Sequence, residues 1–526
     1  MPANPATLPR VTYSNIAEDF TAVHAHLDSL IPQFKASLSA QTRANRIAGR
    51  QDSEGTAYRA VSPIDRDIVL GSFVEASAAA LHRAVGAAHA AYPAWSALDW
   101  QARVEHLEHV AREFERRKYE LSVACLLEVG KSRMEAVGEI EETIDLIRYY
   151  CAEMAANNGY ARDMKRAFSR ERTQVVLRAH GVFGVISPFN FPVALSVAMI
   201  TGALVAGNCV VYKPSPMAGL TGHLLIECFE AAGLPPGAVN LVCGGATVGE
   251  ALVGHPAING IAFTGSHAVG MRIFRSMAAR PFALPVIAEM GGKNPTYVTR
   301  SADITTAASG VMRSAFGLQG QKCSSGSKVY VHDAIYDDFM QALLKLTRAI
   351  RIGNPEDQAI FMGPVINAAA AERFDRAAAS VRQQGRFETG GQRLSGELFD
   401  KGYYVEPSIA VGLPEDHYLH REEQFLPFLT VKRFTDLQRA IADGNSVLYG
   451  LTAGIYTRED EELQLFLKRA EAGVLYANRA SGATTGAWPG IQTFCGWKGS
   501  GASHKGGLGP WYVPQFMREQ SHTVME

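Results

Sequence analysis

Short apolar runs alternate with helical stretches in the middle of the chain, and this alternation leaves few folds open. We predict strands at residues 181–187, 209–212, 239–242 and 258–263. We predict helices between them, within 191–207 and at 220–232 and 249–253. Strands and helices that alternate at this spacing form a parallel sheet covered by helices. The middle of the chain therefore predicts a doubly wound α/β domain of the dinucleotide-binding kind.

A second α/β series follows residue 289. Its recognisable elements are strands at 328–331, 429–434 and 454–456 and a helix at 335–350. The uncharged run 191–212 is about long enough to span a bilayer. Pro192, Gly202 and the pair Gly207 and Asn208 interrupt this run, so we predict a buried helix, a turn and a strand in its place.

Composition limits the classes of function. The 526 residues include 51 Lys and Arg against 52 Asp and Glu, and 47% are hydrophobic, so the chain can bury more than one core and favours neither nucleic-acid nor membrane partners. Seven scattered cysteines without a CxxC pair fit neither a disulfide framework nor a zinc site. We expect no metal, no signal peptide in the N-terminal segment, and a reducing cytoplasm.

Apolar residues recur at helical spacing in the first 40 residues, with Pro32 interrupting them. They are Ile16, Phe20, Val23, Leu27, Leu30, Phe34 and Leu38. This stripe predicts an arm that packs on the body or on a neighbouring subunit.

Cys323 stands alone in the polar, glycine-rich stretch GLQGQKCSSG, just before a predicted strand. A cysteine kept for packing usually has apolar neighbours, whereas small polar neighbours let a substrate carbon approach the sulfur. A nucleophile also needs thiolate character, which nearby groups must supply. On its own, the pattern leaves a bystander thiol the commoner outcome.

Two other segments contain groups that a cysteine nucleophile would use. Asn190, in PFNFP, follows the first predicted strand, and its amide can donate to a developing oxyanion. Glu289, in AEMGGKN, ends an apolar run before a Gly-Gly turn and could deprotonate water. Taken singly, Asn190 would more often form an Asx turn, and Glu289 a helix cap or ion pair.

Two strand ends suit a dinucleotide cofactor. Lys213 and Ser215 offer a cation and a hydroxyl for ribose or phosphate groups. Gly265 and Ser266 form a strand-to-helix turn whose free backbone amides suit a pyrophosphate. Neither segment is a GxGxxG motif, and a glycine that only permits the turn is the alternative.

Eight motifs in one order resemble the aldehyde dehydrogenase superfamily, from about Ser62 to the C-terminus. They are PFNFP, KPS, FTGSxxVG, EMGGKN, GQKCS, REEQF, YGLTAGIYT and FCGWKGSG. The resemblance implies an α/β fold with an N-terminal helical arm (1–50), a Rossmann-type NAD(P)-binding domain (51–160 and 178–288), a small β oligomerisation flap (161–177 and 507–526) and an α/β catalytic domain (289–506). Family members are dimers or larger, so a homo-oligomer that acts on a small aldehyde is expected.

The resemblance also implies roles for single residues. Cys323 would attack the aldehyde carbon, the Asn190 side chain and the Cys323 backbone amide would bind the oxyanion, and Glu289 would activate water to hydrolyse the thioester. The expected cofactor-binding residues are Ser187, Pro188, Lys213, Ser215, Gly265, Ser266, Glu423 and Phe425.

Two departures from the family pattern concern the cofactor. Many members have EEIFGP where this chain has EEQFLP, which changes the residues around Phe425. Many NAD-using members have an acidic residue three positions after the lysine, where this chain has Pro216. Because that carboxylate would repel a 2′-phosphate, its absence predicts measurable NADP use beside NAD.

Within the superfamily, the likeness is greatest to the 1-pyrroline-5-carboxylate dehydrogenases, which oxidise L-glutamate γ-semialdehyde to L-glutamate in proline degradation. The matching substrate-binding residues are Glu135 for the α-ammonium, Phe191 as an aromatic wall, Ser324 as a hydroxyl contact, Gly486 and Ala487 as backbone donors to the α-carboxylate, and Phe494 as a cover. By default, Glu135 would be a solvated helix residue.

Other functions stay open at this point. The chain could oxidise another semialdehyde or a plain aliphatic or aromatic aldehyde with the same chemistry. A CoA-acylating enzyme or an inactive scaffold is disfavoured, because Cys323, Asn190 and Glu289 are all present.

We predict that Cys323 is the only essential thiol. Cys323→Ala should abolish aldehyde-dependent NADH formation while the cofactor still binds, because the nucleophile alone is lost. Cys495→Ala, a change in the FCGWKGSG motif, is the matched control and should stay active. Activity that survived the first change would exclude the covalent mechanism.

Overall fold

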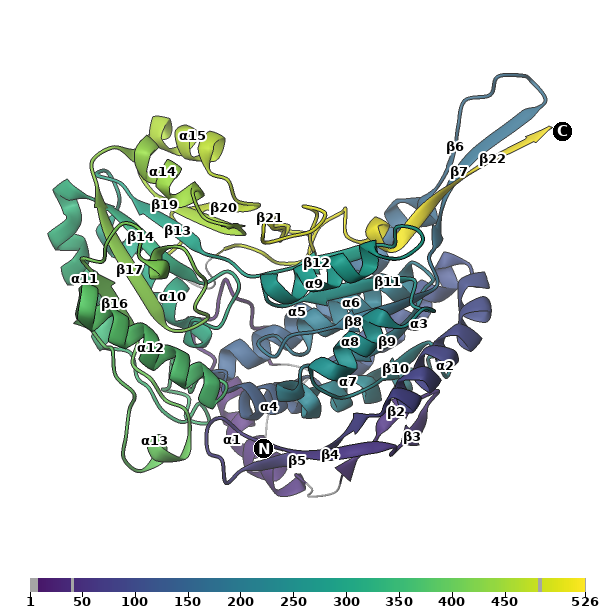
Figure 1. The fold of residues 1–526 in the computed structure, drawn as a ribbon, viewed down its shortest axis with the longest axis horizontal. Coiled ribbons are helices and arrows are strands. Elements are labelled where there is room, and N and C mark those ends of the chain that lie inside the picture. Colours follow the sequence, from purple (N-terminus) through teal and green to yellow (C-terminus); the bar gives the residue numbers. More distant parts are fainter. Residues whose placement is uncertain (1–7, 39–41, 481–484, 526) are drawn as a thin grey trace.

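Two seven-stranded sheets, each packed against helices, form the body of the protein (Figure 1). The computed structural model describes residues 8–38, 42–480 and 485–525. Residues 1–7 and 39–41 of the predicted arm, 481–484 of the predicted catalytic domain and 526 of the predicted flap lie outside the described residues.

The first sheet contains every strand predicted for the middle of the chain. Its order is β12 (Val286–Glu289), β11 (Gly260–Thr264), β8 (Val182–Ile186), β9 (Cys209–Lys213), β10 (Val239–Leu241), β2 (Asn45–Ile47) and β3 (Arg50–Asp52). The five strands from β12 to β10 are parallel, and β2 and β3 are antiparallel additions. All residues of β8 and β9 are buried, as expected for a sheet covered on both faces.

Five helices pack on this sheet. Four of them follow its own strands, namely α6 (Ala194–Val205), α7 (Gly219–Ala231), α8 (Ala246–Gly254) and α9 (His267–Ala278), whereas α2 (Ala78–Ala97) comes earlier in the chain. The uncharged run 191–212 is divided as predicted, into α6, a turn and β9. No helix in the described part of the chain is long and apolar enough to cross a membrane.

The second sheet is also mainly parallel. Its order is β15 (Arg386–Thr389), β16 (Ser408–Val411), β17 (Phe428–Phe434), β14 (Gly326–His332), β13 (Asn294–Val298), β19 (Thr452–Tyr456) and β20 (Val474–Ala477), with β15 antiparallel to its neighbour. Its helices are α10 (Ile304–Phe316), α11 (Tyr336–Arg348), α12 (Ala368–Gln384), α14 (Leu437–Asn445) and α15 (Asp460–Arg469), with a short α13 (Leu398–Lys401) in a loop.

A three-stranded antiparallel sheet projects from the body as a long arm (Figure 1). It consists of β6 (Ala161–Asp163), β7 (Glu171–Ala179) and β22 (Met517–Met525), and β22 pairs with β7 along its whole length. Two smaller sheets pair β1 (Thr42–Arg43) and β4 (Gly55–Val61) with β5 (Val69–Ala76), and β18 (Tyr449–Gly450) with β21 (Trp497–Lys498).

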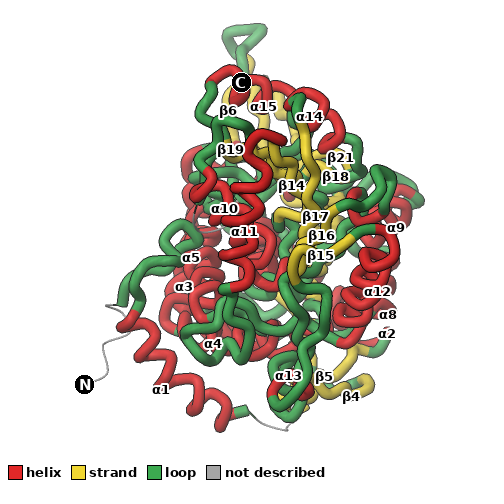
Figure 2. The backbone as a smooth tube through the Cα atoms, turned by 90° about the vertical axis from the view of Figure 1, so that its left-hand side faces the viewer, coloured by secondary structure: helices red, strands yellow, loops and turns green. Residues whose placement is uncertain are grey.

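The N-terminal helix α1 (Thr21–Ser37) lies on the outside of a helical layer beside the first sheet (Figure 2). The layer consists of α3 (Trp100–Arg116), α4 (Lys118–Val129) and α5 (Arg133–Ala156), and α1 packs on α4. The helix runs through Pro32, although proline disfavours a helix interior. Burial of Val23, Leu27, Ile31 and Phe34 on one face stabilises it.

Candidate active site

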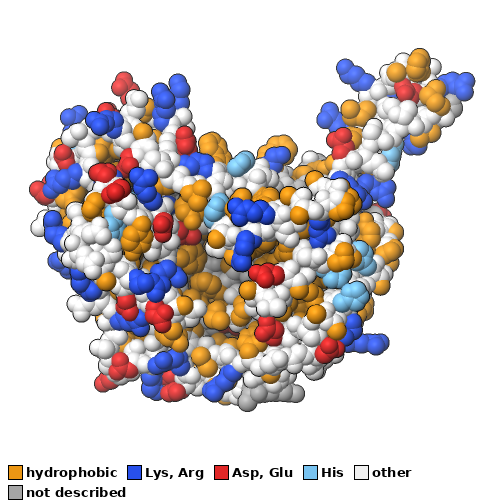
Figure 3. Space-filling model, in the orientation of Figure 1, with side chains coloured by type: hydrophobic (Ala, Val, Ile, Leu, Met, Phe, Trp, Pro, Cys, Tyr) orange, Lys and Arg blue, Asp and Glu red, His pale blue; other side chains and the backbone are white. Residues whose placement is uncertain are grey.

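Cys323 lies where two cavities meet, between the first and the second sheet. One cavity, of about 870 Å³, is bounded by the ends of the first-sheet strands and by the loop before β17. The other, of about 370 Å³, lies towards α5 and the segment 485–508. Cys323 lines both of them. We name them the cofactor cavity and the substrate cavity. Figure 3 shows the hollowed, largely hydrophobic face between the two lobes of the molecule.

The Cys323 thiol faces a carboxyl group. Its Sγ lies 3.8 Å from Oε1 of Glu289, the last residue of β12, and donates to it. Burial raises the pKa of the Glu289 carboxyl to about 8. Burial, together with the charges of Glu289 and Glu423, raises the pKa of the Cys323 thiol well above its ordinary value. Burial therefore favours the protonated thiol beside a carboxyl group whose pKa is near neutral.

Two glycines, Gly291 and Gly292, let Glu423 and the cysteine loop pack closely against the turn after β12. A Cβ on Gly291 would lie 2.0 Å from Oε2 of Glu423, and a Cβ on Gly292 would lie 2.5 Å from the carbonyl oxygen of Cys323. Real Cβ atoms do not approach other atoms so closely, so any side chain here would displace the cysteine loop or Glu423. The packing around Gly291 and Gly292 therefore requires glycine at both positions.

Asn294 fixes the cysteine loop on this turn. Its amide nitrogen donates to the carbonyl oxygens of Cys323 (2.7 Å) and Ser325 (2.8 Å), and its amide oxygen accepts from the backbone of Thr452 (3.0 Å). The side chain is buried and connects three segments. The sequence motif EMGGKN contains Asn294, but only the structure indicates what it does.

Asn190 lies in the loop after β8, as expected, and its side chain is buried. Its amide nitrogen donates to the carbonyl oxygen of Gln321, two residues before Cys323, at 3.0 Å. Asn190 and Cys323 both line the cofactor cavity. An amide nitrogen carries a second hydrogen, so Asn190 can donate to another acceptor near the sulfur.

The structure gathers all eight expected cofactor residues around the cofactor cavity. They are Ser187, Pro188, Lys213, Ser215, Gly265, Ser266, Glu423 and Phe425. Ser266 caps α9 by accepting from the amide of Val269, so the positive end of this helix is directed at the cavity. Phe425 adopts a left-handed backbone with φ of 56° and packs edge-on against Phe189, with ring centroids 5.9 Å apart.

Two ionisable groups of this cavity are strongly affected by burial. The Lys213 ammonium donates to the carbonyls of Pro214 and Gly244, both at 3.0 Å, and burial lowers its pKa to about 8. Glu423 accepts from the amide of Gly292 at 2.9 Å, while burial raises its pKa to about 7. Pro216 also lines the cavity, where the acidic residue of many relatives would stand.

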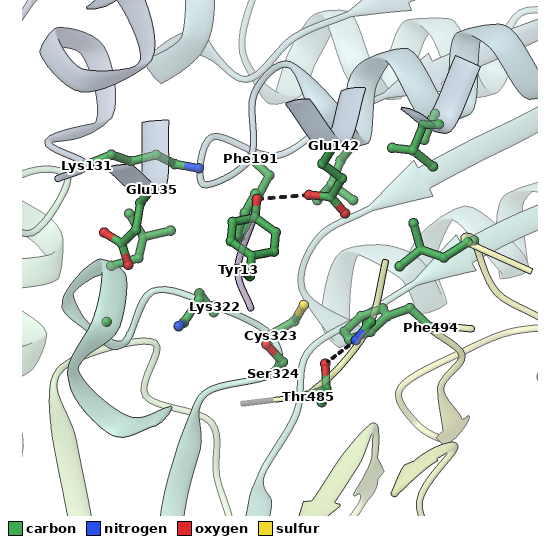
Figure 4. A pocket seen from close by; sticks show the side chains of 18 of the residues that line it. Tyr13, Lys131, Glu135, Glu142, Phe191, Lys322, Cys323, Ser324, Thr485 and Phe494 are labelled. Atoms are coloured by element: carbon green, nitrogen blue, oxygen red, sulfur yellow. Dashed lines mark hydrogen bonds between the residues drawn. The ribbon is translucent and has the colours of Figure 1, made fainter. Parts of the chain in front are cut away.

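The substrate cavity brings together five of the six expected substrate residues (Figure 4). They are Glu135, Phe191, Ser324, Ala487 and Phe494. Glu135 is directed at the cavity and is not a solvated surface residue; it accepts from the hydroxyl of Ser132 at 2.8 Å. The sixth residue, Gly486, does not line the cavity.

The two expected backbone donors are engaged within their own loop. The amide of Gly486 donates to Oε1 of Gln492 at 2.8 Å, and the amide of Ala487 donates to the hydroxyl of Thr485 at 3.2 Å. The sequence gives no signal for these bonds, because they depend on how the loop folds on itself.

Phe191 is held by a buried ion pair. The ammonium of Lys131 lies 3.7 Å from the centre of the Phe191 ring and also pairs with Glu139. Glu139 in turn accepts from the amides of Val193 (2.8 Å) and Ala194 (3.1 Å), where α6 begins. This network fixes the segment that carries Asn190 and Phe191.

Several lining residues had no assigned role in the sequence. Lys322, Arg313 and Glu142 add two cations and a carboxyl group to the substrate cavity, and Tyr13 reaches it from the N-terminal segment. Lys322 directly precedes Cys323 in the GQKCS motif, and Arg313 lies on α10, the helix before the cysteine loop. Their place in the sequence could therefore have suggested that both line the site. Tyr13 and Glu142 lie in segments without a recognisable motif.

In the part of the chain that the structure describes, Cys323 is accompanied neither by a metal-binding group nor by a second cysteine. Among residues 8–38, 42–480 and 485–525, no group of three or more His, Cys, Asp or Glu side chains is placed to hold a metal ion. Cys495 lines neither cavity and donates to the carbonyl oxygen of Gly473 at 3.3 Å, which is a packing role.

A half-buried cysteine and carboxyl pair, with a nucleotide-type cavity on one side and a smaller cavity on the other, suits a dehydrogenase that works through a covalent cysteine intermediate. Residues 50–521 match the aldehyde dehydrogenase family model, and the chain belongs to this family. The resemblance and the fold class expected from the sequence are thereby confirmed.

The similar proteins bear more specific names. The 1-pyrroline-5-carboxylate dehydrogenase of Bacillus subtilis is 34% identical over 471 residues, which is 89% of each chain. The Thermus 1-pyrroline-5-carboxylate dehydrogenase with bound NAD is 31% identical, with a TM-score of 0.92 and complete coverage of both chains. Proline utilization A (PutA) of Bdellovibrio bacteriovorus is 32% identical with a TM-score of 0.91, and the match covers all of this chain and 54% of PutA.

We predict that Gly292 cannot be replaced without loss of activity. Gly292→Ala should lower kcat/KM for an aldehyde about 100-fold, because displacing the Cys323 carbonyl moves the nucleophile by a fraction of an ångström or more. Steady-state kinetics together with thermal unfolding would measure this. Gly86→Ala, in open space on α2, is the control and should keep full activity with equal or higher Tm. Full activity of Gly292→Ala would show that the loop has more freedom than the contact allows.

Proposed function

We propose that the protein oxidises L-glutamate γ-semialdehyde to L-glutamate with NAD, through a thioester on Cys323. The observation that carries the chemistry is the Cys323 thiol at 3.8 Å from the Glu289 carboxyl, at the meeting point of the two cavities. The family membership supports the reaction class.

The names of the relatives and the charges in the substrate cavity support this substrate. Relatives 34% identical over most of the chain are named 1-pyrroline-5-carboxylate dehydrogenase. Side chains of both charges line the cavity, among them the carboxyl group of Glu135 and the basic groups of Lys322 and Arg313. A chain that carries an α-ammonium and an α-carboxylate can pair with both kinds of group.

The residues of the larger cavity fit NAD. Lys213 and Glu423 are suited to ribose hydroxyls, and the start of α9 behind Ser266 suits the pyrophosphate. A relative of known structure carries NAD. Bound NAD supplies the hydride acceptor. NADP use stays a prediction, which rests on Pro216 in place of a carboxylate.

In the first half of the reaction, Cys323 forms a bond with the aldehyde carbon. The thiol proton is released to water as this bond forms, so Glu289 stays available for the second half. The resulting oxyanion would be stabilised by the Asn190 amide and the Cys323 backbone amide. Loss of hydride from the same carbon leaves a thioester on Sγ.

In the second half, Glu289 acts as general base. It takes a proton from water, the hydroxide adds to the thioester carbon, and the Cys323 thiolate leaves as the carboxylic acid forms. Burial, which raises the pKa of Glu289, makes it a stronger base than an exposed carboxylate. Retention of this base argues against transfer to CoA.

One observation favours a second candidate, a dehydrogenase for another semialdehyde or for an aldehyde without an amino-acid group. The amides of Gly486 and Ala487, expected to bind the α-carboxylate, are engaged within their loop. Recognition of the α-carboxylate would then depend on cationic side chains or on a rearranged loop.

We also propose that the projecting β6, β7 and β22 sheet joins subunits into a homo-oligomer. It exposes Met164, Phe168, Val524 and Met525, an unusual set of apolar side chains for a free surface.

All seven cysteines are free thiols, which suits a reducing cytoplasm.

We predict that Glu289→Gln separates the two halves of the reaction. The variant should give a first-turnover burst of NADH followed by slow turnover, because hydride transfer precedes the blocked hydrolysis. In the wild type, hydrolysis should accelerate with pH up to about 8, since only the deprotonated carboxylate is a base. Rapid-mixing absorbance of NADH measures both. The exposed Glu461→Gln on α15 is the control, and loss of the burst would assign Glu289 to the first half instead.

We predict a strong preference for the amino-acid aldehyde. The kcat/KM for glutamate semialdehyde, generated from pyrroline-5-carboxylate, should exceed that for pentanal by about 100-fold or more. Pentanal has no charged groups, so the charged side chains of the cavity would stay unpaired when it binds. L-glutamate should inhibit competitively. Equal efficiency with pentanal and no inhibition by glutamate would favour the second candidate.

A further inference from the structure

The N-terminal segment before α1 forms one wall of the substrate cavity. Tyr13, Ile16, Glu18 and His24, from this segment and the first turn of α1, line the cavity together with residues of α5. The segment is far from Cys323 in sequence, and nothing in its composition indicates that it reaches the site.

Tyr13 is the residue of this segment with the most specific contacts. Its hydroxyl donates to Oε2 of Glu142 on α5 at 2.9 Å (Figure 4). Its ring packs edge-on against Phe191, with centroids 6.2 Å apart, and against Trp488, with centroids 5.5 Å apart. Tyr13 thus joins the aromatic wall on one side to the loop after residue 485 on the other.

Polar contacts fix the N-terminal segment on α5 and link it, through Asp145, to the loop of Trp488. Arg10 donates to Oε2 of Glu141 at 3.1 Å and to Oδ2 of Asp145 at 2.8 Å, both on α5. The indole nitrogen of Trp488 donates to the same Asp145 oxygen at 2.8 Å. One carboxylate therefore holds the N-terminal segment and the loop of Trp488 together.

Helix α5 has a glycine where the Tyr13 ring packs on it. A Cβ on Gly138 of α5 would lie 3.2 Å from Cε1 of Tyr13, which is tighter than most real contacts. The absence of a side chain at Gly138 lets the ring lie directly on α5. Gly138, Phe191 and Trp488 therefore confine the Tyr13 ring, and Glu142 binds its hydroxyl.

We infer that Tyr13 is a specificity-determining residue, which limits the size of the aldehyde chain that the substrate cavity accepts. The inference rests on the proposed aldehyde oxidation, but it does not depend on which aldehyde is preferred. A ring held by four neighbours cannot swing aside at low cost, so a longer or bulkier chain meets a fixed wall. Removing the ring would add room beside Phe191 and Trp488.

The hydroxyl has a separate effect. Glu142 also lines the cavity, and burial raises its pKa to about 7. The Tyr13 hydroxyl occupies one of its oxygens and so keeps this carboxyl turned to the wall. Tyr13→Phe would free that oxygen while keeping the ring, which separates the two effects.

The test compares hexanal with acetaldehyde as substrates, using the full chain and NAD. In Tyr13→Ala the ratio of kcat/KM for hexanal to that for acetaldehyde should rise about 10-fold or more, since added apolar contacts then become available to the long chain. In Tyr13→Trp the ratio should fall. In Tyr13→Phe it should stay within twofold of the wild type.

Leu27→Ala is the matched control. Leu27 is buried in α1 but does not line the cavity, so its truncation loosens the arm without changing the wall. It should leave the ratio unchanged. If Tyr13→Ala fails to fold, Tyr13→Trp still tests the wall from the opposite direction.

The outcomes are distinguishable. An unchanged ratio in folded Tyr13→Ala and Tyr13→Trp, or an equal shift in Leu27→Ala, would overturn the inference and leave the proposed function intact. A wild type that oxidises no aldehyde would overturn the proposed function and the inference with it. A wild type that oxidises simple aldehydes but not glutamate semialdehyde would overturn only the proposed substrate, and the ratios would still decide the role of Tyr13.

Discussion

The active site depends on a single crossing of the chain from one sheet to the other. β12 is an edge strand of the first sheet and ends in Glu289, and β13 of the second sheet begins five residues later at Asn294. The cysteine loop is hydrogen-bonded to Asn294 and lies against Gly292 within this crossing. General base, nucleophile and the contact to Glu423 are therefore all positioned by the six residues 289–294. A change in how the two sheets sit relative to one another would act directly on the Cys323 and Glu289 distance.

The same crossing explains the electrostatics of the site. Glu289, Glu423 and Lys293 lie in or against the turn, and burial moves the pKa of each towards neutrality, to about 8, 7 and 7. A group with a pKa near the working pH exchanges its proton at low cost in both directions. The protein reaches this condition by removing water from the crossing and not by placing strong charge partners beside each group.

The sequence predicted the parts of the site that stand at strand ends. Asn190, Lys213, Ser266 and Glu289 each follow or end a strand, and the edge of a doubly wound sheet at which such residues meet is set by topology. Features that depend on long-range packing were not predictable in this way. The occupied amide of Gly486 depends on the fold of one loop, and the contact of Tyr13 with Glu142 joins segments whose patterns carry no sign of each other. The predicted helical arm was visible because its apolar stripe has a period, whereas the segment before it has none.

The pairing of β7 with β22 has a consequence for biosynthesis. The two strands are hydrogen-bonded from Ala179 opposite Met517 to Glu171 opposite Met525, although the whole second sheet lies between them in sequence. On the ribosome, β6 and β7 emerge early and remain a two-stranded hairpin, which is marginally stable by itself. The third strand can join only after residues up to 525 have been synthesised, by which time both large sheets can already have folded. The projecting sheet of β6, β7 and β22 is thus completed last, and an unfinished chain lacks its finished surface.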